Sequence, residues 1–120
     1  MYVDGFVIPV RKKQLRIYKK MAEIGKKVWK KHGALDYKEC VADDFRNKWG
    51  ISFSKLAKKK SSETIVFSYI VFKSKAHRNQ VNAKVMKDPE LKCCGEMTMP
   101  FDMKRMAYGG FKVFVGTGLK

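Results

Sequence analysis

The sequence has few acidic residues and no long apolar run. Only 11 of its 120 residues are Asp or Glu, against 27 Lys or Arg, so the formal net charge is +16. No apolar run approaches the roughly 20 residues that cross a bilayer. The N-terminus also lacks the charged, apolar and small-residue regions of a secretory signal. Residues 1–120 are therefore expected to form a single cytoplasmic domain with no membrane partner.

Cysteine and histidine are also scarce. The chain has three cysteines, Cys40, Cys93 and Cys94, and two histidines, His32 and His77. An odd cysteine count with two adjacent residues is a poor disulfide framework. There is no C-x-x-C pair of the kind that binds zinc. We expect reduced thiols, no metal site and no cofactor.

The positive charge is concentrated in residues 11–31, which contain ten of the basic residues and one acid, Glu23. Such a patch attracts nucleic acid, anionic lipid or acidic proteins. However, 22 of the basic residues are Lys and only five are Arg, the residue that binds phosphates and bases bidentately. No nucleic-acid-binding motif accompanies the charge. We favour a solvated lysine face and keep nucleic-acid or acidic-partner binding through residues 11–31 as an alternative.

Hydrophobic periodicity predicts four strands and two helices. The predicted elements are a strand at 3–10, a helix at 12–32, strands at 34–42 and 64–72, a helix at 75–87 and a strand at 106–115. Residues 43–63 form a connection with a short strand or helical turn around 51–57, and residues 90–105 form a long loop. Gly33 is expected to end the first helix, and Ser74 to cap the second.

This order of elements is that of a ferredoxin-like α+β fold, βαββαβ. It predicts a four-stranded antiparallel sheet with both helices on one face. The other sheet face would then be apolar and uncovered, and such faces normally bind a partner. A two-fold homodimer that packs sheet on sheet is the simplest solution.

Five segments together resemble a known family. They are YVDGF (2–6), GALDYKECVADD (33–44), ETIVFSYIVFKSKAHR (63–78), NAKVMKDP (82–89) and MPFDMKRMAYGGF (99–111). The family is the short bacterial domain of unknown function 1428, within the dimeric α+β barrel superfamily. The resemblance covers almost the whole chain. Met103 stands where a glycine is usual and Tyr69 where a tryptophan is common.

The resemblance implies a bacterial dimeric α+β barrel protein and a homodimer, but it does not imply an activity. The wider superfamily includes cofactor-independent monooxygenases, haem-degrading enzymes and small-ligand binding proteins. To carry any of these chemistries over would be an analogy from fold alone.

Glu39 is the first candidate for catalysis or binding. The alternation in residues 34–42 places it on the same strand face as Leu35, Tyr37 and Val41. A carboxylate on an apolar face needs a partner or a raised pKa. His77 and Arg78, at the start of the second predicted helix, are candidates for a proton shuttle and an anion site.

The segment 99–111 supplies the remaining candidates. Its pair Gly109-Gly110 lacks the further glycines of a phosphate-binding loop and fits a strand better. Asp102 is a catalytic candidate that with Lys104 and Arg105 forms either a local charge network or a pocket rim. The candidate pocket wall is methionine-rich. The ligand-binding candidates are Tyr69, Arg78, Met99, Phe101, Arg105 and Met106, and Met103 also belongs to that wall.

Two functions from different classes follow. The favoured hypothesis is a small apolar pocket that binds a ligand, with polar groups drawn from Glu39, Tyr69, Asp102 and Arg105. The alternative is a cofactor-independent oxygenase or isomerase, which needs a buried base beside a substrate-sized cavity.

Overall fold

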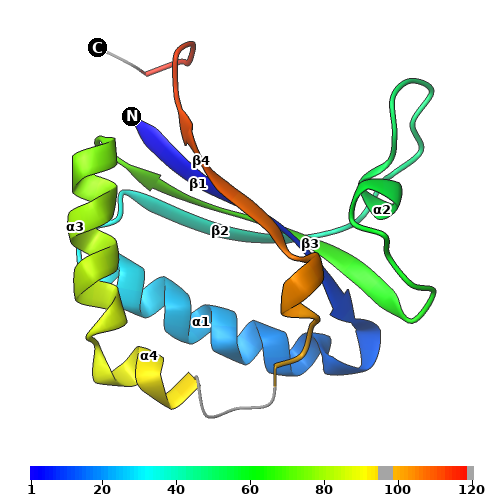
Figure 1. Ribbon diagram of the computed structural model, residues 1–120, viewed down its shortest axis with the longest axis horizontal. Coiled ribbons are helices and arrows are strands. Elements are labelled where there is room, and N and C mark those ends of the chain that lie inside the picture. Colours follow the sequence, from blue (N-terminus) through cyan, green and yellow to red (C-terminus); the bar gives the residue numbers. More distant parts are fainter. Residues whose placement is uncertain (95–98, 119–120) are drawn as a thin grey trace.

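The computed structural model describes residues 1–94 and 99–118. Its elements follow the predicted order, with short helical additions (Figure 1). They are β1 (Tyr2–Arg11), η1 (Lys12–Gln14), α1 (Leu15–Lys31), β2 (Asp36–Val41), α2 (Phe53–Leu56), β3 (Glu63–Phe72), α3 (Lys75–Met86), α4 (Pro89–Cys94), η2 (Met103–Arg105) and β4 (Ala107–Lys112).

The strands form one antiparallel sheet in the order β2-β3-β1-β4. Strand β1 pairs with β3 along its whole length, from Tyr2 opposite Phe72 to Arg11 opposite Glu63. The edge strand β2 pairs with β3 alone, with Glu39 opposite Ser68. The predicted ferredoxin-like fold is therefore confirmed.

The helices α1, α3 and α4 lie on one side of the sheet (Figure 1). Helix α1 buries Tyr18, Gly25 and Val28, because these residues recur at helical spacing on its apolar stripe. Val28 packs with Ile70 and Phe72 of β3 and with Val81 and Val85 of α3 in one buried cluster. Tyr18 packs in a second cluster with Ile8, Val10 and Val66. These contacts fix α1 across the strands that carry the site.

The prediction of one long loop over residues 90–105 is wrong, because α4 extends into that range and η2 lies within it. A carboxylate oxygen of Asp88 accepts the backbone N–H of Glu90, and Pro89 is the first residue of α4. Proline is well tolerated at that position because its missing N–H has no helical partner there. Residues 95–98 lie outside the described residues, as do the side chains of Cys93 and Cys94, on which the prediction of reduced thiols partly falls.

Within residues 1–94 and 99–118, the opposite face of the sheet is covered at one end only. The connection between β2 and β3 contains the expected helical turn, α2, and Ser52 caps it by accepting the N–H of Lys55. This connection lies over the start of β3, where Ile65 is buried. Phe67 of β3 faces the same way, and its ring meets Phe53 of α2 edge-on with the centroids 6.2 Å apart. Farther along, Tyr69 of β3 and Phe111 of β4 also face away from the three helices, by strand alternation. We call this surface the open face.

A carboxylate pocket between α1 and β2

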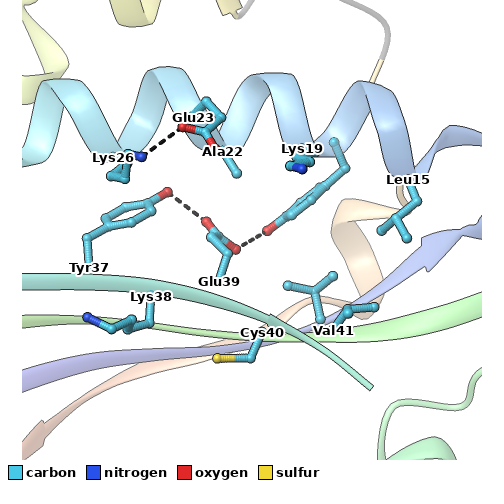
Figure 2. A pocket seen from close by; sticks show the side chains of 12 residues that line it. Leu15, Lys19, Ala22, Glu23, Lys26, Tyr37, Lys38, Glu39, Cys40 and Val41 are labelled. Atoms are coloured by element: carbon cyan, nitrogen blue, oxygen red, sulfur yellow. Dashed lines mark hydrogen bonds and ion pairs between the residues drawn. The ribbon is translucent and has the colours of Figure 1, made fainter. Parts of the chain in front are cut away.

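A cavity of about 390 Å³ lies between α1 and the edge strand β2. Its apolar wall is formed by Leu15 and Ala22 of α1, Val41 of β2 and Val66 of β3. Figure 2 shows Glu39 projecting from β2 toward α1 into this space, with Tyr37 beside it. We call this cavity the Glu39 pocket.

Each oxygen of the Glu39 carboxylate accepts a hydrogen bond from a tyrosine. The Tyr18 hydroxyl donates to Oε1 over 2.6 Å, and the Tyr37 hydroxyl donates to Oε2 over 2.6 Å. Alternation along β2 directs both Tyr37 and Glu39 toward α1, while the core-facing stripe of α1 supplies Tyr18. Two elements therefore hold one carboxylate in a fixed orientation.

Tyr18 remains a phenol at physiological pH. Burial raises the pKa of its hydroxyl well above the usual value, and the charge of Glu39 and the hydrogen bond to it raise the pKa further. Tyr18 therefore acts as a donor. A carboxylate has about four acceptor positions, and these phenols occupy two of them. The carboxylate retains capacity for a donor on a bound molecule.

Lysines surround the mouth of the pocket. Lys26 pairs with Glu23 over 2.8 Å, and both residues line the cavity (Figure 2). Lys38 pairs with Asp36. Lys19 also lines the cavity and has no ion pair or hydrogen bond within residues 1–94 and 99–118. The apolar interior thus has a cationic entrance.

A family model described as "Protein of unknown function (DUF1428)" matches residues 1–103. The chain belongs to the DUF1428 family. This DUF1428 protein is 41% identical over 114 residues to an uncharacterized protein, YbaA, of Escherichia coli strain K12, covering 95% of this chain and 97% of YbaA. The YbaA protein of Shigella flexneri matches with the same identity and coverage.

A solved structure supports the fold of this DUF1428 protein. It is that of an uncharacterized NIPSNAP domain protein from Burkholderia xenovorans, with a TM-score of 0.52 and 9% sequence identity. The alignment covers 100% of this chain and 99% of that chain. At this identity the likeness concerns the fold alone.

The structure does not bring the four predicted pocket residues of this DUF1428 protein together. Tyr69 lies on the open face, on the opposite side of the sheet from Glu39. Asp102 caps η2 by accepting the N–H of Lys104, and it pairs with Arg105 over 3.2 Å. This is the local charge network considered from the sequence.

Arg105 is directed at a different carboxylate. Its guanidinium donates two hydrogen bonds to Glu63, one to each oxygen, over 2.7 and 2.5 Å. Glu63 is only 2% exposed. These hydrogen bonds lower the pKa of Glu63 to about 2. The pair connects η2 to the start of β3 and contributes nothing to the Glu39 pocket.

His77 and Arg78 also have structural partners. Ser74 accepts the backbone N–H of His77, and the His77 ring nitrogen Nδ1 accepts the backbone N–H of Lys73. Arg78 pairs with the buried Asp4 over 3.1 Å, and its guanidinium lies 5.0 Å from the centre of the Tyr2 ring. Neither side chain lines the Glu39 pocket.

The three remaining candidates lie behind the Glu39 pocket or away from it. The Met99 carbonyl accepts a hydrogen bond from Arg11. The Phe101 ring meets the Tyr18 ring edge-on at 5.9 Å, and both Phe101 and Met106 pack against the buried cluster that contains Tyr18. Phe101 therefore supports the orientation of Tyr18 without lining the cavity.

Helical spacing predicts Tyr18 in the core but does not identify it as part of the site. The available signal was its hydroxyl group, because a tyrosine on a core-facing stripe usually needs a hydrogen-bond partner. Tyr37 was recognised only as a neighbour of Glu39 on the same strand face. Neither pattern indicated that both phenols reach one carboxylate.

The structure also bears on the expectations about metal binding, membrane spans and the basic helix. Among the described residues, no three His, Cys, Asp or Glu side chains are grouped to hold a metal ion. No helix in the described part of the chain is long and apolar enough to span a membrane. The basic residues of α1 are largely exposed, and binding of nucleic acid there stays a prediction.

Proposed function

We propose that this protein binds a small, mainly apolar molecule that donates a hydrogen bond to Glu39. The observation that carries the proposal is a carboxylate held by two phenols at the wall of an apolar cavity. A volume of about 390 Å³ lies within the range of small-molecule sites. Apolar walls with a few fixed polar groups are typical of such sites.

The arrangement supports binding better than acid–base catalysis. General acid–base catalysis usually needs a second group that returns or relays the proton. The described residues lining the cavity include no histidine, and His77 is engaged in the cap of α3. Tyr18 is held as a phenol. The two hydrogen bonds fix the carboxylate for recognition of a ligand donor.

We also propose that two copies pack through their open faces. Phe67 of β3 is 43% exposed and Phe111 of β4 is 63% exposed, and large exposed apolar side chains on one sheet face are typical of an interaction surface. The charge distribution permits this contact despite a net charge of +16, because most lysines of α1 lie on the helix side of the sheet. On the open face of β2, Lys38 is neutralised by Asp36.

Binding can be tested with para-hydroxybiphenyl, which has an apolar body and one donor, and with para-methoxybiphenyl, which lacks the donor. Titration calorimetry should show binding of the hydroxyl compound about tenfold tighter than of the methoxy compound, because hydrogen bonds to charged groups are the stronger ones. Glu39→Gln should remove most of this difference. The alternative, an oxygenase or isomerase, is tested on the same samples by measuring whether para-hydroxybiphenyl is converted to a product.

Two matched variants test the location. Ala22→Phe places a ring inside the pocket and should abolish binding, while Ala83→Phe adds the same ring at an exposed position of α3 and should leave binding unchanged. Equal binding to both variants would contradict the pocket. Equal affinities for the two biphenyls would also contradict the proposal, because Glu39 would then accept no hydrogen bond from the ligand.

A further inference from the structure

We propose that the natural ligand of the Glu39 pocket is an amphipathic anion, with an acidic group that lies against Lys30 in an adjoining cavity. The inference rests on the proposed function and names its ligand class. A second cavity of about 230 Å³ lies between the last turns of α1 and the start of β2. It shares Lys26, Tyr37 and Lys38 with the Glu39 pocket, so the two cavities adjoin.

The second cavity carries excess positive charge. Its lining includes Lys26, Lys30 and Lys38, and the one acid among its lining residues is Asp36. Asp36 is already paired with Lys38. Lys26 is paired with Glu23, outside this cavity. Lys30 forms no ion pair or hydrogen bond with any residue that the structure describes, so its ammonium group is available to a ligand anion.

We call the two adjoining cavities together the groove, and its two polar ends are a fixed distance apart. Along β2, Glu39 and Asp36 are three residues apart, which corresponds to about 10 Å. Along α1, Ala22 beside the Glu39 pocket and Lys30 beside the second cavity are eight residues apart, or about 12 Å. A ligand that reaches both ends therefore needs its donor and its acidic group about 10 Å apart.

The boundary between the cavities favours a slender ligand. Tyr37 lines both cavities, and its hydroxyl lies against Gly25 of α1, 2.7 Å from where a Cβ would stand. The Tyr37 ring therefore stands between the two cavities, and a ligand that occupies both has to pass on the outer side of the ring, beside Lys26 and Lys38, which line both cavities. An alkyl chain can follow such a surface more easily than a second ring system.

The ligand class can be tested with three probes on the full chain. ω-Hydroxydecanoate has a donor and a carboxylate at about the required separation, its methyl ester lacks the charge, and decanoate lacks the donor. At low salt, titration calorimetry should show the hydroxy acid binding about tenfold tighter than its ester. Decanoate should also bind more weakly than the hydroxy acid.

Variants of α1 locate the anion site. Lys30→Gln should reduce the preference for the acid over the ester to about twofold or less, and Lys30→Glu should reverse it. Lys20→Gln removes the same charge from an exposed position of α1 that lines neither cavity, and it should leave the preference intact.

The outcomes separate this inference from the proposed function. If acid and ester bind equally, or if Lys20→Gln acts like Lys30→Gln, the anion site is wrong while ligand binding at Glu39 stands. If none of the three probes binds and para-hydroxybiphenyl does, the groove is not continuous and the inference fails alone. If para-hydroxybiphenyl also fails to bind, both proposals are overturned.

Discussion

Gly25 and Tyr37 are in contact across the boundary between α1 and β2, and the tyrosine hydroxyl lies 2.7 Å from the position that a Cβ on residue 25 would take. The same hydroxyl donates to Glu39. Glycine inside a helix costs about 1 kcal/mol relative to alanine. Here the missing side chain leaves room for the phenol that holds the site carboxylate.

Gly25→Ala should therefore show a stability effect that depends on residue 37. In the wild-type background the new methyl group must displace the Tyr37 hydroxyl, which cancels the gain in helix propensity and weakens binding of para-hydroxybiphenyl. In a Tyr37→Phe background the hydroxyl is absent, so Gly25→Ala should stabilise the protein by about 1 kcal/mol. Chemical unfolding of the four proteins measures this coupling. Equal effects in both backgrounds would contradict the contact.

Tyr18 should contribute to stability at alkaline pH in a defined way. Its pKa is raised above 10 in the folded protein and is ordinary in the unfolded chain, so its contribution is complete below about pH 10 and is lost as the pH rises further. Near pH 8 the free energy of unfolding should be larger for the wild type than for Tyr18→Phe by about 1 to 2 kcal/mol. That advantage should shrink above pH 10. Tyr108→Phe, at a residue that is 72% exposed, should track wild type throughout.

Glu63 should contribute to the acid limb of the stability curve, together with Asp88, whose pKa is also held well below its usual value by hydrogen bonds from Lys31 and His32. Hydrogen bonds from Arg105 lower its pKa to about 2, against an ordinary value of 4.5, so its stabilisation is present above about pH 4.5 and is lost as the pH falls toward 2. The loss should amount to about 3 kcal/mol. Glu63→Gln should make this limb shallower without removing it, because Asp88 still titrates, whereas Glu23→Gln at an exposed ion pair should leave the slope unchanged. If the stability of Glu63→Gln falls with pH as steeply as that of the wild type, Glu63 does not contribute to the acid sensitivity.

The proposed dimer predicts a difference between the two faces of the sheet. Phe67→Glu puts a charge on the open face and should convert the protein to monomers in sedimentation equilibrium. Tyr108→Glu changes an exposed aromatic residue that alternation places on the helix side of β4, and it should leave the association constant unchanged. Higher salt should strengthen association by screening the repulsion between two chains of net charge +16. A wild-type monomer at all concentrations would overturn the proposal.

Local pattern predicted the face on which Glu39 lies but not its partners. Period-two alternation placed Tyr37 and Glu39 on one side of β2, and helical spacing placed Tyr18 on the apolar stripe of α1. The hydrogen bond between Tyr18 and Glu39 joins residues 21 positions apart. This hydrogen bond depends on where α1 crosses the sheet, and neither the strand alternation nor the helical spacing specifies that position.

Strand register explains why Tyr69 does not lie in the pocket with Glu39, as the sequence predicts. Alternation fixes the faces within one strand, but the relation between two strands depends on which residues pair. The pairing of Lys38 with Tyr69 places Tyr69 on the face opposite Glu39. A shift of one residue would have reversed that result.

The sequence by itself determined the order of elements, the antiparallel α+β sheet and the family, because these depend on periodicity and local segments that are readable in one chain. It also determined that Glu39 would share a face with apolar residues. Only the tertiary structure decided that Tyr18 and Tyr37 bind Glu39, while Arg105 and Arg78 bind Glu63 and Asp4. The physical reason is that such contacts depend on helix placement and strand register, which packing of the whole core sets.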